Sequence, residues 1–100
     1  MEIKTSNEQW WDVHYLDNNT LFAQRYGDIW TTDEYGDKCQ VIPWVEYWDD
    51  DKERPFHYAA SYYNEQGDFI DAIHEDFHKF VNEDELKEIE DILLKEFNKQ

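Results

Sequence analysis

The sequence is poor in the residues on which many common protein classes depend. Its single cysteine, Cys39, excludes an internal disulfide framework and any cysteine-rich zinc module. It has no apolar run long enough to span a bilayer or to form the core of a signal peptide. No repeat and no linker rich in Gly, Ser or Pro divides it. We therefore expect one domain, residues 1–100, in the cytoplasm.

Basic residues are also scarce, and acidic and aromatic residues are abundant. Nine basic residues stand against 25 acidic ones, which gives a net charge of -16. Such a surface repels phosphate backbones and anionic membranes. Aromatic residues make up 18% of the chain, too many for an acidic disordered segment, which needs low hydrophobicity as well as high charge. The composition predicts a folded domain with an aromatic core and a carboxylate surface that fits a basic protein partner.

Several stretches show the period of two that is typical of β-strands. They span residues 10–16, 20–26, 29–32, 38–48 and 56–63. Turn residues at 17–19, 27–28, 33–37 and 64–68 and a charged loop at 49–55 bound them. In the longest stretch, alternation places one set of side chains on one face, namely Cys39, Val41, Val45 and Tyr47. The other face then carries Ile42, Trp44 and Trp48. Pro43 cannot donate to a ladder, which indicates an edge strand or a bulge there.

The clearest helix signal lies at the C-terminus. Asn82 is a good N-cap, and Glu85 three residues later completes a capping box. The apolar stripe that follows consists of Leu86, Ile89, Ile92, Leu93 and Phe97. The segment 68–80 fits both a strand and a helix, and we favour a strand that turns helical near His74. The predicted fold is α+β: an antiparallel β-meander of about four to six strands packed against this amphipathic C-terminal helix.

One five-residue motif points to an enzyme. Residues 74–78 read HExxH and resemble the zincin metallopeptidases, in which two histidines one helical turn apart bind zinc. The resemblance implies His74 and His78 as ligands and Glu75 as general base. It would need a third ligand from the final helix, for which the candidates are Glu88, Glu90, Asp91 and Glu96. Asp76 departs from the zincin pattern, and no Gly-x-x-His extension follows. We favour two surface histidines, with no catalytic residue, metal or cofactor, and keep the small zinc peptidase as an alternative.

Acidic runs beside aromatic residues are the candidate binding sites, because carboxylates can steer a basic partner and rings can anchor it. One run follows Trp30, a second follows Trp48, and a third precedes Phe77. We favour the second run, and the sequence leaves open which cluster forms the interface. The predicted partner-binding residues are Asp33, Glu34, Trp48, Asp49, Asp50, Asp51 and Glu53.

In charge, size and aromatic content the chain resembles two groups of small acidic proteins. One consists of bacterial immunity proteins that neutralise nuclease toxins, in the manner of antitoxins. The other consists of phage proteins that mimic DNA and block restriction, CRISPR or repair enzymes. The resemblance implies a protein inhibitor of a basic, nucleic-acid-acting protein, which itself binds neither nucleic acid nor membrane and is not an enzyme. A generic acidic interaction module is a further alternative.

Overall fold

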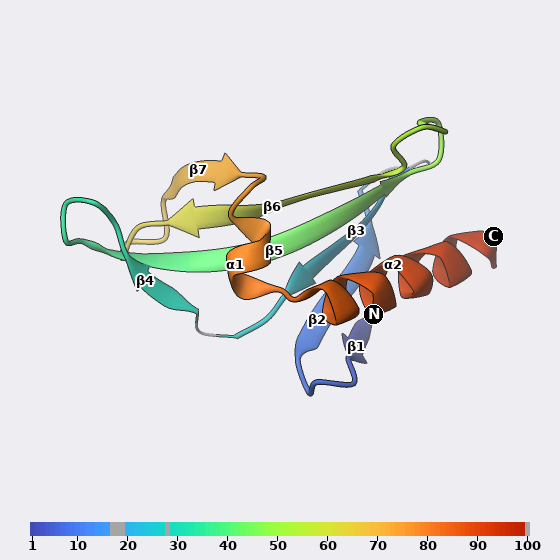
Figure 1. Cartoon of the computed structure of the whole chain (residues 1–100), viewed down its shortest axis with the longest axis horizontal. Coiled ribbons are helices and arrows are strands. Elements are labelled where there is room, and N and C mark those ends of the chain that lie inside the picture. Colours follow the sequence, from blue (N-terminus) through green and yellow to red (C-terminus); the bar gives the residue numbers. More distant parts are fainter. Residues whose placement is uncertain (17–19, 28, 100) are drawn as a thin grey trace.

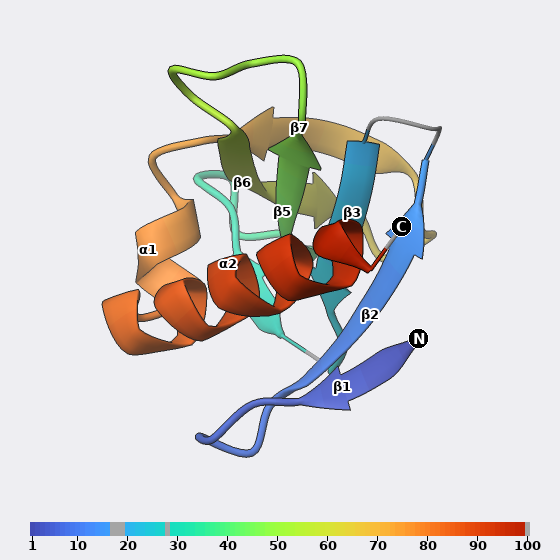
Figure 2. The same cartoon turned by 90° about the vertical axis from the view of Figure 1, so that its right-hand side faces the viewer.

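The computed structural model describes residues 1–16, 20–27 and 29–99, so the turn predicted at 17–19 and the break at Asp28 lie outside the described residues. Within these ranges, seven strands form one antiparallel sheet. They are β1 (Glu2–Lys4), β2 (Trp10–Tyr15), β3 (Thr20–Arg25), β4 (Trp30–Thr32), β5 (Lys38–Trp48), β6 (Phe56–Tyr63) and β7 (Phe69–Ile73). Two helices, α1 (Phe77–Phe80) and α2 (Glu83–Asn98), lie on one face of it (Figures 1 and 2).

The predicted α+β class is confirmed, with small corrections to the strands. The sheet order is β1-β2-β3-β5-β6-β7. β3 and β4 both pair with the same edge of β5, β4 with its first residues and β3 with its last. The strand count slightly exceeds the predicted range because β1, with three residues, is too short to show an alternating pattern. The prediction for residues 68–80 is confirmed, since β7 is followed by α1.

The position of Pro43 corrects the prediction of an edge strand or a bulge. It lies in the central strand β5, and the pairing of β5 with β6 runs past Pro43 and Ala60 without a register shift. On the other side of β5, pairing with β3 ends at Trp44, and pairing with β4 begins at Gln40. The Val41 N–H donates toward Ile29 on that side. Because alternate N–H groups of a strand point the same way, the nitrogen of Pro43 faces the interval between β3 and β4, where no ladder bond is lost.

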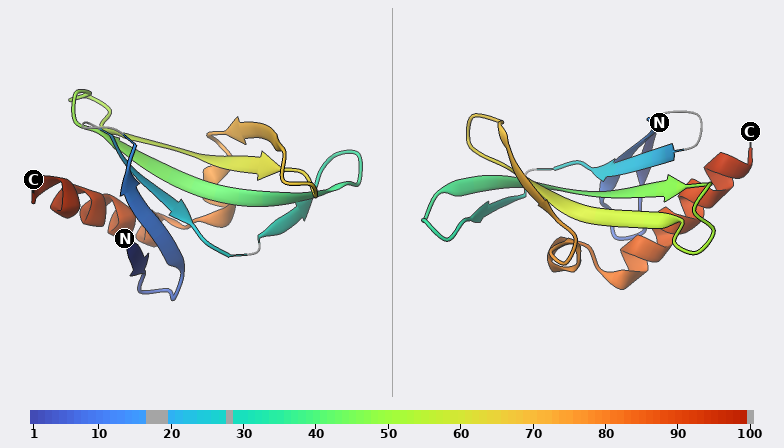
Figure 3. Two further views of the ribbon diagram at one scale, coloured as in Figure 1. Left: turned by 180° about the vertical axis from the view of Figure 1, so that it is seen from behind. Right: turned by 90° about the horizontal axis from the view of Figure 1, so that it is seen from above.

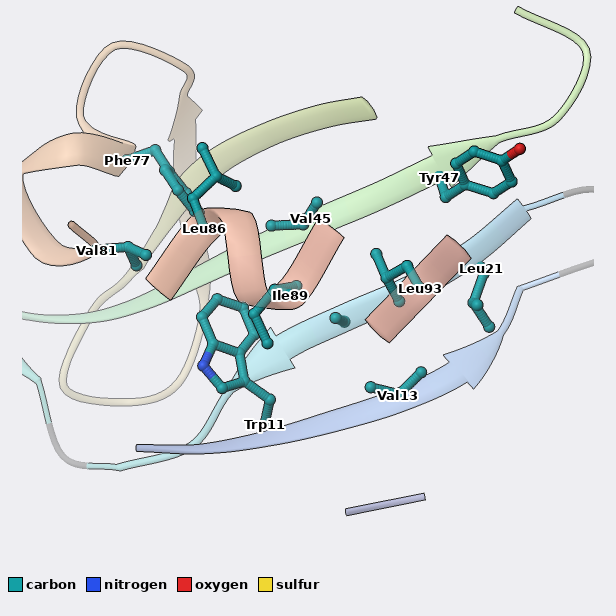
Figure 4. Packing of buried hydrophobic residues seen from close by; sticks show 11 residues of the cluster. Trp11, Val13, Leu21, Val45, Tyr47, Phe77, Val81, Leu86, Ile89 and Leu93 are labelled. Carbon is teal, nitrogen blue, oxygen red and sulfur yellow. The ribbon is translucent and has the colours of Figure 1, made fainter. Parts of the chain in front are cut away.

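The core lies between α2 and the sheet. Leu86, Ile89 and Leu93 of α2 are buried, as predicted, and Figure 4 shows them against side chains of β2, β3 and β5, among them Trp11 and Val45. Phe97 is only partly buried and packs its ring on Tyr47, with centroids 5.1 Å apart. Ile92, which the stripe included, lies outside this core. In the described part of the chain, no helix is both long and apolar enough to cross a membrane.

Candidate partner-binding surface

The sheet has one face that the helices leave uncovered. Both helices pack on the same face, and no other described element covers the opposite one (Figure 3). Because successive side chains of a strand point to opposite faces, the burial of Val45 and Tyr47 under α2 turns Trp44, Glu46 and Trp48 outward. The strand register places the remaining members beside them. We call the resulting surface the open face and define it by His14, Phe22, Trp44, Glu46, Trp48 and His57.

Aromatic rings form much of the open face. Phe22 of β3 lies between His14 and Trp44, with ring centroids 5.3 Å and 6.1 Å away. At the end of β5, Trp48 packs on His57 at 4.5 Å. Hydrogen bonds hold both indoles in place. The Nε1 of Trp44 donates to the Ser61 hydroxyl at 2.8 Å, and that of Trp48 donates to the Glu46 carboxylate at 2.6 Å. Rings fixed in this way lose little side-chain entropy when a partner covers them.

Carboxylates border these rings along the strands. Glu46 lies directly opposite Phe22 in the strand register, and Asp12 lies two residues before His14 on β2. The Asp12 carboxylate is 2.9 Å from Nδ1 of His14 and 3.8 Å from the N-terminal ammonium group. The sequence alone gave no reason to select Asp12, Phe22, Glu46 or His57 as binding residues. The alternating pattern of each strand can be read in the sequence. The proximity of these residues depends on which strands pair, which the sequence pattern does not show.

The loop between β5 and β6 continues the open face at one end of the sheet. Asp51 accepts a hydrogen bond from the Arg54 N–H at 3.0 Å, and this bond, with His57 nearby, lowers the pKa of Asp51. Asp49 is 3.5 Å from the Lys52 ammonium group. Among the described residues, no hydrogen bond or ion pair engages the side-chain carboxylates of the exposed Asp50 and Glu53. The loop therefore offers carboxylates to solvent around a turn that Asp51 stabilises.

The predicted binding residues lie in two places that the fold does not bring together. Trp48, Asp49, Asp50, Asp51 and Glu53 lie at the end of β5, whereas Asp33 and Glu34 lie before its start. The 11 residues of β5 rise about 3.3 Å each, so roughly 35 Å separate the two groups. Oδ1 of Asp33 also accepts the N–H groups of Tyr35 and Asp37 at 2.9 Å each, which shapes the β4–β5 turn. The two predicted runs therefore lie on two separate surfaces.

The second surface contains a cavity of about 600 Å³. It lies on the helix side of the sheet, where the β4–β5 turn, β7 and α1 meet. Its floor holds a fixed pair of side chains: the Tyr62 hydroxyl donates to Oδ2 of Asp76 at 2.5 Å, and Oδ1 of Asp76 is 3.0 Å from the Lys79 ammonium group. Burial and the Asp76 carboxylate raise the pKa of Tyr62, and the hydrogen bond from Tyr62, helped by Lys79, lowers the pKa of Asp76. We call this cavity the hairpin groove and define it by Glu34, Tyr35, Tyr62, Asp71, Asp76 and Phe80.

The HExxH residues do not lie on one helix. His74 belongs to a bend after β7, and α1 begins only at Phe77. His74 stacks on the ring of Tyr58 at 4.7 Å and its Nδ1 lies 2.8 Å from the Tyr58 carbonyl oxygen. His78 meets the same ring edge-on, with Nε2 3.3 Å from its hydroxyl. Across residues 1–16, 20–27 and 29–99, no three His, Cys, Asp or Glu side chains converge as metal ligands. The arrangement therefore lends no support to the peptidase alternative.

No protein-family model, curated protein or solved structure matches this chain.

Proposed function

We propose that the protein is a cytoplasmic inhibitor that binds and blocks a basic protein acting on nucleic acid, through the open face and the β5–β6 loop. The observation that supports this most is the combination found on the open face. Phe22, Trp44 and Trp48 form a fixed group of rings on an uncovered sheet surface. Glu46 and the β5–β6 loop place carboxylates directly beside them.

Each half of this arrangement has a separate physical role. A charge of -16 accelerates encounter with a positively charged protein and keeps nucleic acid away from the same surface. Rings at the centre of an interface slow dissociation, because they bury large areas at low entropic cost. A partner that matches both must present Lys or Arg around an apolar patch. A surface that grips nucleic acid offers the basic component, so its occupation would also inhibit that partner. An immunity protein for a nuclease toxin and a phage anti-defence protein both fit this description.

The test is affinity capture from the native host, followed by an inhibition assay on the purified partner. The wild-type protein and the variant Glu46→Gln/Asp49→Asn/Asp50→Asn serve as baits. A control bait, Glu8→Gln/Glu65→Gln/Asp91→Asn, removes three exposed charges elsewhere. We expect wild type and control to retain a basic nuclease or nucleic-acid-binding enzyme and to inhibit it at one equivalent. The open-face variant should bind it at least tenfold more weakly at low salt.

Two outcomes would reject the proposal. In one, the retained protein is neutral or acidic. In the other, it is basic, but its activity on nucleic acid is unchanged at saturating inhibitor. The second result would favour the generic interaction module. Loss of binding in the control bait as well as in the open-face variant would show that total charge, and not the open face, determines association.

A further inference from the structure

The hairpin groove combines negative charge with exposed apolar surface, on the opposite side of the sheet from the open face. Four carboxylates line it, those of Asp33, Glu34, Asp71 and Asp76, against one ammonium group, that of Lys79. Lys79 is already 3.0 Å from Asp76. Among the described residues, the Glu34 carboxylate has no hydrogen bond or ion pair, and the only hydrogen bond to the Asp71 carboxylate comes from the adjacent Ala72 N–H. The groove therefore holds negative charge that the described part of the chain does not neutralise.

Apolar and aromatic groups stand beside these carboxylates. Tyr35 is 81% exposed and Ile70 is 50% exposed, although large apolar side chains are costly to leave in water. Deeper in the groove, the rings of Tyr62 and Phe80 meet edge-on with centroids 6.4 Å apart. A volume of about 600 Å³ lies in the range of ligand pockets, about 300–1,000 Å³. An occupant with both a positive charge and an apolar part would satisfy both features.

The chemistry separates an organic cation from a metal ion. A small metal ion needs several oxygen ligands around one point. No three acidic, His or Cys side chains of the described residues converge in that way. The lining of the groove instead combines carboxylates with the rings of Tyr35, Tyr62 and Phe80. A guanidinium group fits this pattern better than an ammonium group, because it is planar, stacks on aromatic faces and is weakly hydrated.

We propose that the hairpin groove is a receptor for an arginine side chain, with the guanidinium group held by Glu34 and Asp71 and the methylenes against Ile70 and Phe80. The source of this arginine is identified through the proposed function, on which this step rests. The arginine belongs to the basic partner. Asp76, pinned by Tyr62 and Lys79, forms a floor that is already ordered before binding. The inhibitor then holds its partner at two places, one on each side of the sheet.

The groove can be tested without the partner, by NMR titration with three small probes. Nα-acetyl-arginine amide is the probe, Nα-acetyl-citrulline amide is its uncharged analogue of the same shape, and Nα-acetyl-lysine amide tests the ammonium alternative. We expect the arginine probe to shift the resonances of Tyr62 and Phe80 saturably, the lysine probe to bind at least threefold more weakly, and the citrulline probe not to bind. In Glu34→Gln/Asp71→Asn, affinity for the arginine probe should fall at least fivefold. Asn at 71 keeps an oxygen that can accept the Ala72 N–H, so this local hydrogen bond within β7 is retained.

The matched control is Glu8→Gln/Asp91→Asn, which removes the same charge from exposed positions outside the groove. It should leave affinity for the arginine probe within twofold of wild type. The proposal is overturned if the shifts do not saturate, if citrulline binds equally well, or if the control weakens binding as much as the groove variant. Such a failure is distinct from failure of the proposed function. If the arginine probe does not bind, capture of a basic partner through the open face is still expected. If no basic partner is captured, binding of the arginine probe to the groove is still expected.

Discussion

The indole Nε1 of Trp11 donates a hydrogen bond of 2.8 Å to the carboxylate of Glu85, joining β2 to the first turn of α2 within the core. Asn7 donates to the same carboxylate at 3.1 Å, and the guanidinium group of Arg25 lies 3.5 Å away. Arg25 also donates to the Phe80 carbonyl oxygen at 2.7 Å. Glu85 is 4% exposed, and a buried charge is tolerated only when it is paired and hydrogen-bonded. This carboxylate therefore connects the β1–β2 turn, two strands and both helices.

Removal of the Glu85 carboxylate should be strongly destabilising. Glu85→Ala leaves the Trp11 N–H without an acceptor and Arg25 without its carboxylate, for which we expect a loss of about 3 kcal/mol. Glu85→Gln keeps an oxygen for Trp11 and should lose less than half of that. Urea unfolding followed by Trp fluorescence measures both. The exposed Asp91→Asn on the same helix should change stability by less than about 0.5 kcal/mol. A cost below about 1 kcal/mol for Glu85→Ala would show that water replaces the carboxylate.

Glu85 also shows where prediction from the sequence ends. The spacing of Asn82 and Glu85 predicted a capping box, and the half that depends on local geometry is confirmed, since Asn82 accepts the Glu85 N–H at 2.8 Å. The reciprocal half is wrong, because the Glu85 carboxylate points into the core toward Trp11. Trp11 is 74 residues away in the sequence. A capping pattern extends over four residues and contains no information about a partner at that distance.

The faces of the strands could be predicted, but their neighbours could not. The period of two in β5 placed Trp44 and Trp48 on one face and Val45 and Tyr47 on the other, as the structure has them. The companions of those residues are fixed by strand order and register, which a single strand does not encode. For the same reason the Asp33–Glu34 run belongs to a groove formed with β7 and α1.

Replacing single α2 side chains by Ala should distinguish positions inside the core from positions outside it. Ile89 is fully buried at the centre of the core, whereas Ile92 is partly exposed and lies outside it. Ile89→Ala should cost about 2–5 kcal/mol, because it removes apolar burial and leaves a cavity. Ile92→Ala, the matched control, should cost less than half as much. Thermal and urea unfolding of both variants measure the difference. Equal losses would mean that α2 is rotated on the sheet.

Glu90 should destabilise the protein at neutral pH. Burial raises its pKa above the ordinary value, and Asp91 and Glu83 raise it further. A carboxyl group whose pKa is raised by folding favours the folded state only while it is protonated. Its benefit is complete below the unfolded pKa, about 4.3, and is lost as the pH rises through the folded value. Glu90→Gln should therefore raise Tm at pH 7 and have a much smaller effect at pH 3. Calorimetry at the two pH values checks this, and an equal change at both would contradict it.

The β5–β6 loop should control how fast the basic partner binds, and the adjacent indole should control how slowly it leaves. Asp49→Asn/Asp50→Asn removes the half-buried charge paired with Lys52 and one exposed charge, and it keeps Asp51, whose bond to the Arg54 N–H stabilises the loop. Unfolding free energy should stay within about 0.5 kcal/mol of wild type, because exposed charges contribute little to stability. The association rate should fall severalfold at low salt, and the difference should shrink above about 0.1 M salt, where the Debye length is about 10 Å.

Trp48→Ala should instead raise the dissociation rate, since it removes a ring but no charge. Stopped-flow binding at several salt concentrations separates the two effects, with Glu8→Gln/Asp91→Asn as the charge-matched control. If the loop variant and this control slow association equally, steering comes from the whole molecule. If Trp48→Ala changes only the association rate, the ring is not part of the interface.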